Sequence, residues 1–378
     1  MLIRRYRVRL KPTKEQEQLF VKSCGVMRWA YNYGLQRKIE EYKKDKSNLS
    51  RLIIRKEIQT LRKKEEYEWI SEVSTKVYDE ALRDLDKAFS FFFKGLKNFP
   101  KYKTKKHKLS FYTRNEGVWF KDGFVNMEKI GKVKYTANFY LPQGWNVYHF
   151  MDTRVIHDGK YWYLIFGMEV NEKQVDLNQN LSIGIDLGVK ELAVCSNGLR
   201  FKNINKTFKM KKLDKTINRL QRKLSKKYKL NDGETTNNII KLERKIKLTY
   251  RKTKQIRLNY IHNVTRRIIN LKPYRIVLED LKVKNMIKNK YLSKAISEQL
   301  FYEFRRQIEY KSEIYKIEVV IANRWYPSSK TCSCCGNINK NLKLYNRVYK
   351  CEHCGLVIDR DLNASINLSN YKINEISK

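Results

Sequence analysis

Ile183-Gly184-Ile185-Asp186-Leu187-Gly188 is an apolar stretch that ends in an acid and a glycine. It predicts a buried strand and a glycine turn, because a second short apolar run, residues 192–195, follows at once. Residues 274–280 form another apolar run that ends in Glu279 and Asp280. Helical periodicity fills much of the sequence between these runs, so we expect an α/β domain with carboxylates at its strand ends.

A third acid, Asp361, opens the last predicted helix. Taken singly, an acid at a strand end usually forms a turn, and an acid at a helix start usually caps the helix. In a strongly basic chain, Asp186, Glu279 and Asp361 together favour a different interpretation. Three converging carboxylates can hold two divalent metals about 3.5–4 Å apart, which activate water and stabilise the leaving oxygen of a phosphodiester. Magnesium suits such oxygen ligands.

Two Cys-x-x-Cys pairs, Cys332/Cys335 and Cys351/Cys354, are separated by fifteen residues and predict a tetrahedral zinc site. Four cysteines would fill every coordination position and leave none for water, so we expect a structural rather than a catalytic zinc. Cys334 lies between the first two ligands and is a competing thiol.

Net charge is the outlier of the composition, since 81 Lys and Arg against 39 Asp and Glu give +42. Such an excess favours a polyanionic partner, and nucleic acid is the expected one. The 378 residues, 42% of them hydrophobic, suffice for two or three folded domains. No apolar run is long enough to span a bilayer, and the first residues lack the pattern of a signal peptide. We therefore expect a cytoplasmic protein that works at the nucleoid.

Other chemistries find little support in the sequence. The glycine-rich loops of nucleotide hydrolases and of dinucleotide enzymes are both missing. The five histidines are dispersed and form no clear catalytic constellation.

Two segments combine positive charge with features that suit nucleic acid. Residues 101–108 interleave lysines with Tyr102, which offers base stacking beside phosphate contacts, although an ordinary solvated basic loop is as good an interpretation of this segment alone. Residues 208–270 show two helical stripes broken at 231–233, and their polar faces carry mostly Lys and Arg. We expect a basic helical hairpin beside a nucleic-acid channel.

The N-terminal part predicts a strand and then helices. Residues 4–10 alternate basic and apolar side chains, as in a strand. Thr13 and Gln16 match a capping box at the start of a helix over 14–45, and a second helix is expected over 74–94.

The pattern then changes to short β-rich runs between 98 and 170, one of them at 139–141, with Asp-Gly turns between them. These features predict a small antiparallel barrel or sheet. Further on, we expect a helix over 290–312 and a strand over 318–322.

Taken in order, these motifs resemble those of the TnpB-type (OrfB) proteins of bacterial insertion sequences. The resemblance covers essentially the whole chain. It is carried by Tyr6–Gln16, Gly25-x-x-Arg28-x-x-Tyr31-Asn32, Phe99–Lys103, Gly184–Gly188, Leu278–Leu281, Ser328–Gly336 and Asp359–Ala364.

The resemblance implies an RNA-guided DNA endonuclease, related to compact type V CRISPR effectors. A noncoding RNA from the end of the element would supply the guide; the protein would read a short motif beside the target, and base pairing would read the rest. Asp186, Glu279 and Asp361 match the family's three catalytic, magnesium-binding positions, and Asp359 ranks second in the last motif. The four paired cysteines match its zinc motif.

The resemblance also implies a fold with α/β, all-α and β-barrel parts. Residues 1–13 would be the first strand of a wedge β-barrel, which a helical recognition domain over 14–97 interrupts and residues 98–178 complete. An RNase H-like (RuvC) nuclease domain would span 179–378. It would include the basic helical insertion 208–270 and a zinc ribbon at 328–358.

In such a fold the N-terminal domains bind guide and target. This implies nucleic-acid contacts along the first strand, the first helix and the basic turn: Arg5, Arg7, Arg28, Lys101, Tyr102, Lys103, Lys105 and Lys106.

Two other functions stay open at this point. One is a nuclease-silent, guide-dependent DNA-binding regulator or transposition accessory factor, although a silent relative has no need for all three acids. The other is a transposase that joins strands by transesterification with the same metal chemistry.

Overall fold

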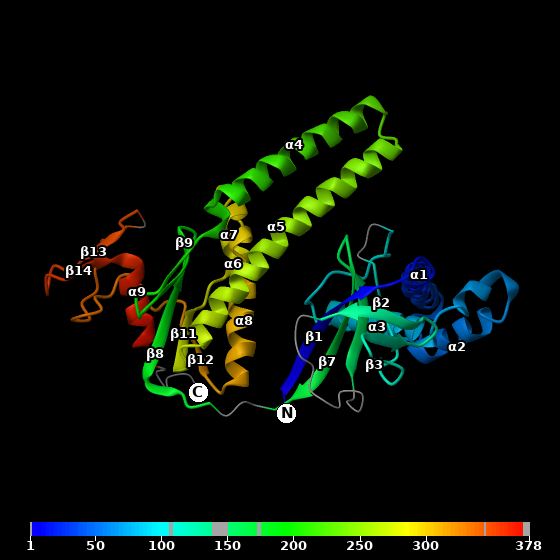
Figure 1. The fold of residues 1–378 in the computed structure, drawn as a ribbon, viewed down its shortest axis with the longest axis horizontal. Helices are drawn as coiled ribbons and strands as arrows, with labels where there is room; N and C mark the ends of the chain where they lie inside the picture. Colours follow the sequence, from blue (N-terminus) through cyan, green and yellow to red (C-terminus); the bar gives the residue numbers. More distant parts are fainter. Residues whose placement is uncertain (1, 106–108, 138–149, 172–174, 344, 373–378) are drawn as a thin grey trace. The chain divides into compact units, whose positions relative to one another are not determined.

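The computed structural model describes residues 2–105, 109–137, 150–171, 175–343 and 345–372 (Figure 1). The chain divides into two compact units, Ile3–Val170 and Asn171–Lys378. The sequence places the corresponding boundary after residue 178. The segment before that boundary belongs with the second unit because its sheet already begins at Asn178, which pairs with Pro273.

The helices of the first unit begin at a capping box. Thr13 and Gln16 exchange hydrogen bonds, 3.1 Å from the Thr13 N–H to Gln16 Oε1 and 3.3 Å from the Gln16 N–H to Thr13 Oγ1, which confirms the predicted helix start. The helical elements of this unit are α1 (Lys14–Asp45), α2 (Arg51–Leu61), the 3₁₀ helix η1 (Glu65–Ile70) and α3 (Thr75–Phe93). The predicted helices over 14–45 and 74–94 are confirmed, whereas the sequence analysis does not predict α2.

Within the described residues, seven strands of this unit form one sheet in the order β2-β6-β7-β1-β5-β4-β3. Asp122 and Gly123 both adopt positive φ angles, 50° and 78°, and join β3 to β4 by the predicted two-residue turn. The predicted strand at 139–141 lies outside the described residues. The strands are β1 (Leu2–Lys11), β2 (Ser110–Tyr112), β3 (Trp119–Lys121), β4 (Phe124–Met127), β5 (Gly131–Thr136), β6 (Met151–His157) and β7 (Trp162–Val170).

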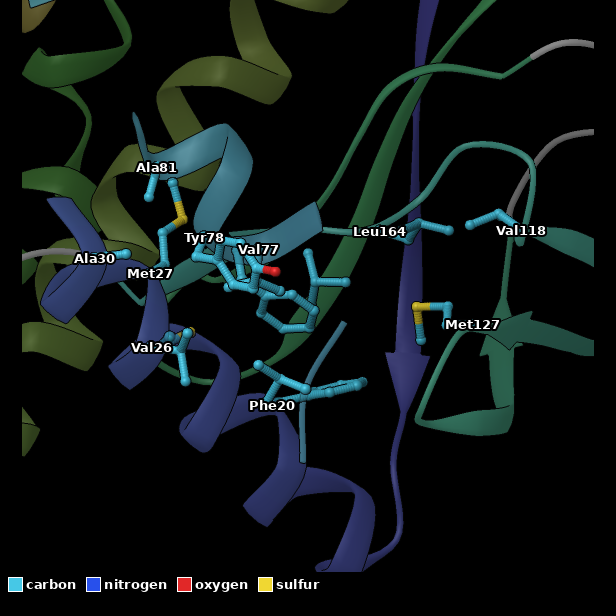
Figure 2. Close-up of a cluster of buried hydrophobic side chains, with 14 of the residues drawn as sticks. Phe20, Val26, Met27, Ala30, Val77, Tyr78, Ala81, Val118, Met127 and Leu164 are labelled. Carbon is cyan, nitrogen blue, oxygen red and sulfur yellow. The ribbon is translucent and has the colours of Figure 1, made fainter. Parts of the chain in front are cut away.

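One hydrophobic core joins the helices of the first unit to its sheet. Figure 2 shows side chains of α1, such as Phe20 and Met27, packed with Tyr78 of α3 and facing Leu164 and Met127 of the sheet. Phe20, Tyr78 and Leu164 are fully buried. The helical segment therefore folds onto the sheet that it interrupts in sequence.

The second unit is built on a mixed sheet. In the described part of the chain its order is β10-β9-β8-β11-β12, with β11 parallel to both β8 and β12 and β9 antiparallel to β8 and β10. The strands are β8 (Asn178–Leu187), β9 (Glu191–Cys195), β10 (Arg200–Lys202), β11 (Pro273–Glu279) and β12 (Glu318–Ala322). The predicted strands in these places are confirmed.

Helices cover both faces of this sheet. Ile276 and Leu278 of β11 pack in one core with α5 and α8, whereas Val277 between them packs on the opposite face with Leu368 of α9. This alternation is the two-residue period of a strand that is buried on both sides. The helices are α4 (Phe208–Leu230), α5 (Asn237–Ile269), α6 (Val283–Met286), α7 (Ser293–Gln299), α8 (Phe301–Ile314) and α9 (Arg360–Ser369), with the 3₁₀ helix η3 (Ile204–Lys206) before α4.

Two predictions about these helices have different outcomes. The basic hairpin is confirmed, because α4 and α5 form a long antiparallel pair that projects from the sheet of this unit (Figure 1). The single helix predicted over 290–312 is wrong. Leu300 adopts φ 55° and separates α7 from α8, since a left-handed residue cannot continue a right-handed helix.

Candidate active site

Strand β8 and helix α9 approach each other closely at Gly184. A Cβ atom at this position would overlap the carbonyl oxygen of Ser365 and the backbone nitrogen of Ser369. Only glycine lets the helix backbone approach the strand so closely. At the other end of the contact, the Ser182 hydroxyl donates to the Ser369 carbonyl at 2.9 Å. Because α9 runs back along β8, its first turn lies beside the carboxyl end of that strand.

Asp186 and Glu279 reach this same edge from adjacent parallel strands. Ile185 pairs with Leu278, and the next residue on each strand is one of the two acids. Carboxyl ends of parallel strands share one edge of a sheet, so the register brings the two acids side by side. Asp361, in the first turn of α9, interacts electrostatically with Asp186, as does Glu279.

Asp359 has a structural task at the start of α9. Its Oδ1 accepts hydrogen bonds from the backbone N–H groups of Asp361, at 3.1 Å, and Leu362, at 3.0 Å, which caps the helix. It also forms an ion pair with Arg200 at 3.1 Å. Burial raises the pKa of Asp359, but the backbone hydrogen bond from Leu362 and the Arg200 guanidinium outweigh burial and hold the pKa below its usual value. Asp359 therefore orients Asp361.

The two strand acids are poorly compensated. Burial, followed by the charges of Asp361 and Glu279, raises the pKa of Asp186 to about 7. Burial, followed by the charge of Asp280, raises the pKa of Glu279. The charge of Arg360 lowers the pKa of Asp186 but does not offset burial and the neighbouring acids. A divalent cation would supply the remaining counter-charge for the ionised carboxylates.

The acids are near one another but are not in contact as a closed ligand set. Among His, Cys, Asp and Glu of the described residues, one group of three or more is placed to hold a metal ion, and its ligand atoms all lie within 4.8 Å of one another. That group is the four paired cysteines.

These four cysteines come from two turns, Cys332 and Cys335 from one and Cys351 and Cys354 from the other, and their sulfurs meet between the turns. The Sγ atoms of Cys332 and Cys354 lie 3.5 Å apart, and those of Cys335 and Cys351 lie 3.6 Å apart. Tetrahedral zinc with bonds of about 2.3 Å would space its sulfurs by about 3.8 Å. Cys334 is exposed and lies outside the group.

Both turns are Cys-x-x-Cys-Gly turns with the same backbone. Gly336 and Gly355 have φ angles of 76° and 73°, and each donates its N–H to the carbonyl of the first cysteine of its turn at 3.0 Å. Positive φ at these positions explains the two glycines. Hydrogen bonds from the backbone of Cys354 and His353 lower the pKa of Cys351, whereas the neighbouring thiols raise the pKa of Cys354. Without a metal, the four thiols therefore do not all ionise together, and a bound cation would favour their thiolates.

Two asparagines, Asn363 and Asn367, tie the cysteine site to α9. The Asn363 amide donates to the Thr331 carbonyl at 2.6 Å and accepts from the Ser333 N–H at 2.9 Å. One turn later, Asn367 donates to the carbonyls of Ser328 at 2.7 Å and Thr331 at 2.6 Å. Asn363 is fully buried. Asn363 lies in the motif Asp359–Ala364 that the sequence analysis quotes, but neither asparagine is predicted there to contact the cysteine segment. Their spacing of four on a predicted helix is a usable signal.

The first-strand cations predicted to contact nucleic acid are paired with the protein's own groups. Arg5 lies 2.9 Å from Asp152, and its side chain is 69% exposed. Arg7 lies 3.4 Å from Asp158, and its guanidinium lies 3.6 Å from the centre of the Tyr163 ring.

The basic turn has one half-buried lysine among exposed side chains. The Lys103 ammonium lies 3.7 Å from the centre of the Tyr31 ring, and burial lowers its pKa. Its backbone is bound to the Asn32 amide by hydrogen bonds of 2.8 and 2.9 Å. Arg28 is half-buried, while Lys101, Tyr102 and Lys105 are exposed. Lys106 lies outside the described residues. The asparagine and tyrosine of the N-terminal motif therefore hold this turn in place.

Three family models match the chain in succession. They are the OrfB helix-turn-helix domain over residues 1–47, the OrfB "Probable transposase" over 166–290 and the Cas12f1-like TNB domain over 301–368. A Streptomyces pristinaespiralis protein, named "Putative RNA-guided DNA endonuclease", is 29% identical over 97% of this chain and 88% of its own length. Along nearly its whole length, the chain is similar to TnpB-type (OrfB) proteins.

One more relative and one solved structure are also similar to the chain. InsQ of Escherichia coli K12, which bears the same description, is 26% identical over 96% of the chain and 90% of its own length. The structure of Cas12f1 with sgRNA and target DNA superposes with a TM-score of 0.62 at 18% identity, covering 95% of this chain and 83% of that one. This likeness shows a shared fold and confirms the mixed α/β class. Among the described residues, no helix combines the length and apolarity needed to cross a membrane.

Proposed function

We propose that this TnpB-type chain is an RNA-guided, metal-dependent DNA endonuclease of an insertion sequence. The observation that carries the proposal is the meeting of Asp186, Glu279 and the first turn of α9 at one edge of the sheet. The acids come from three distant parts of the sequence, and the close approach of α9 to β8 at Gly184 brings the first turn of α9 to this edge.

The donor set of this edge fits magnesium. Carboxylate oxygens are the ligands that Mg²⁺ prefers, and the raised pKa values of Asp186 and Glu279 mark a deficit of positive charge. Two Mg²⁺ ions bound there would supply an activated water and stabilise the leaving oxygen of the phosphodiester. Asp186 and Glu279 would hold them from the strands, and Asp361 would do so from the helix that Asp359 orients.

The arrangement of the sheet supports a RuvC-like, RNase H-like assignment for residues 179–378. Strands β10, β9 and β8 form an antiparallel set, and β11 and β12 extend it in parallel. We assign the sheet of the first unit to a wedge β-barrel formed by residues 1–13 and 98–178. We assign residues 14–97 to a helical recognition domain.

We propose structural zinc at Cys332, Cys335, Cys351 and Cys354, in a zinc ribbon over 328–358. Their sulfurs approach tetrahedral spacing and leave no position for water. The zinc would fix the backbone around Thr331, to which Asn363 of α9 is hydrogen-bonded. It would therefore act on catalysis only through the position of Asp361.

We assign guide RNA and target DNA as the partners of the basic surfaces. The net charge of +42 and the basic faces of α4 and α5 suit polyanions, and relatives named RNA-guided endonucleases cover nearly the whole chain. Such a protein would work at the nucleoid in the cytoplasm. The first-strand arginines and the basic turn remain candidate contacts.

The test is guided cleavage by the co-expressed protein and its RNA. The wild-type complex should cut target DNA in Mg²⁺, while Asp186→Ala should bind guide and target equally well and cut at least about 100-fold more slowly. Glu318→Ala is the matched control, since this exposed acid lies at the opposite end of the parallel strand β12. Full cutting by Asp186→Ala would exclude the site. Guided binding without cutting by the wild type would favour the silent regulator, and strand joining would favour the transposase.

A further inference from the structure

A pocket of about 580 Å³ opens beside the candidate metal site, within the second unit. Its walls are the carboxyl ends of β8 and β11, the segment 281–285 and the first turns of α8. This volume lies in the range of about 300–1,000 Å³ that pockets for small ligands occupy. It is therefore large enough for one nucleotide.

The pocket shares a wall with the acids. Glu279 lines it directly, and Leu187, which follows Asp186, lines it as well. A group bound in the pocket is therefore a neighbour of any phosphate held at the acids.

One wall carries an aromatic ring. Phe301 and Phe304 of α8 are buried in the core, which turns Tyr302 and Arg305 outward on a common face three residues apart. Tyr302 is 73% exposed although it lines the pocket. Its ring stacks on no other aromatic ring of the described residues.

One cation of the pocket, the Arg305 guanidinium, is held in place by acids. Arg305 lies 3.7 Å from Asp280 and 2.7 Å from Glu309, and Asp280 also pairs with Arg324 at 2.8 Å. Asp280 thus holds two arginines next to Glu279. Lys282 and Lys284 line the pocket from the segment after β11.

We propose that this pocket binds one nucleotide of the DNA strand that is cut, next to the scissile phosphate. Its base stacks on Tyr302, and its backbone phosphate is met by Arg305, Lys282 and Lys284. An aromatic face beside cations is the usual combination for single-stranded nucleic acid, because every base has a stacking face and every nucleotide a charge. The proposal rests on the proposed endonuclease function and adds the residues that position its substrate.

The direct test is photo-crosslinking in the full complex. Asp186→Ala protein with its guide RNA is bound to targets that carry 5-iodouracil at single positions around the cut site, so that the DNA stays whole. Irradiation should crosslink one position to the peptide that contains Tyr302, and the Tyr302→Leu substitution should remove that crosslink. Crosslinks confined to other peptides would overturn the pocket assignment.

The second test is the single-turnover cleavage rate at saturating complex. Tyr302→Ala should cut between about 5- and 150-fold more slowly, the equivalent of one base–aromatic stacking interaction, with target binding unchanged. Tyr302→Phe and Tyr302→Trp should restore the rate. Tyr291→Ala is the matched control, because Tyr291 is a nearby tyrosine that is 96% exposed and does not line the pocket.

The outcomes separate the two proposals. A wild-type complex that cuts no DNA in Mg²⁺ overturns the endonuclease function and the pocket assignment with it. A wild type that cuts, with Tyr302→Ala cutting equally fast, overturns the pocket assignment alone.

Discussion

Asp186 is a buried acid whose ionisation costs the folded protein stability. Its carboxyl is buried on a strand next to two other acids, and its pKa rises from 3.8 to about 7. Between about pH 4 and pH 7 the folded protein keeps a proton that the unfolded chain releases. The free energy of unfolding therefore falls as pH rises through this window.

Replacing the acid should recover that stability. In Mg²⁺-free buffer we expect Asp186→Asn to be more stable than wild type at pH 8, by at most about 4 kcal/mol, and of similar stability near pH 4. Thermal unfolding at a series of pH values measures the difference, and added Mg²⁺ should shrink it at pH 8. Glu318→Gln, at an exposed acid, provides the control. A difference that does not change with pH would contradict the burial of an ionisable Asp186.

At the scale of elements, the site depends on how α9 lies on β8. Gly184→Ala forces a methyl group into the helix backbone at Ser365, so α9 must move away from the strand. Overpacking of this kind costs about 1–3 kcal/mol, and displacement of Asp361 should slow cleavage about 100-fold.

Melting temperature and single-turnover cleavage measure the two effects of Gly184→Ala. Gly25→Ala is the control, because its Cβ would meet no atom within 4 Å and alanine suits a helix better than glycine. Unchanged cleavage by Gly184→Ala would mean that the position of α9 is not critical.

The hydrogen bonds of Asn363 to the cysteine segment predict a variant that loses activity but keeps its zinc. Asn363→Ala leaves the Thr331 carbonyl and the Ser333 N–H without their partner, which costs about 1–3 kcal/mol for each buried group. We expect the variant to keep about one zinc per chain but to cut more slowly, since Asp361 loses its support.

Zinc content by mass spectrometry and the cleavage rate together check the Asn363 prediction. The control is Asn341→Ala, at an exposed position in the loop between the cysteine pairs. Loss of zinc and activity in parallel would instead make Asn363 a part of the metal site itself.

How far the sequence predicts these elements depends on how local their signals are. The helix over 14–45 is predictable because Thr13 and Gln16, three residues apart, form the capping box at its start. The acids are predictable because apolar strands end at them. The break at Leu300 is not, since a left-handed leucine has no sequence signature. Tyr302 follows just after that break, so the sequence does not indicate which face of the helix it occupies.

Charge is the property that belongs to the molecule as a whole. The protein has a net charge of +42 and two basic helices, α4 and α5. Its affinity for guide RNA should fall steeply as the salt concentration rises, because the entropy gained by releasing counterions from the RNA then decreases. Between 50 and 200 mM salt we expect affinity to fall by about 10³-fold or more, measured by filter binding.

Charge removal on α4 tests which surface is responsible. Substituting the exposed residues Lys211, Arg219 and Arg222 with Gln should lower the slope of log affinity against log salt by about 0.7–0.9 for each phosphate that the variant no longer neutralises. An unchanged slope would place the RNA on other parts of the chain.

The asparagine contacts between α9 and the cysteine turns also bear on how the protein is made. Asp186 and Glu279 leave the ribosome well before Asp361, and both cysteine pairs lie between Glu279 and that last acid. With zinc bound as proposed, the third acid would join the other two only after the cysteine segment has been synthesised and has folded around that zinc. As an endonuclease of the proposed kind, the chain would therefore be unable to cut DNA while it is still being synthesised. In a cell starved of zinc, finished protein would accumulate whose third acid is not positioned.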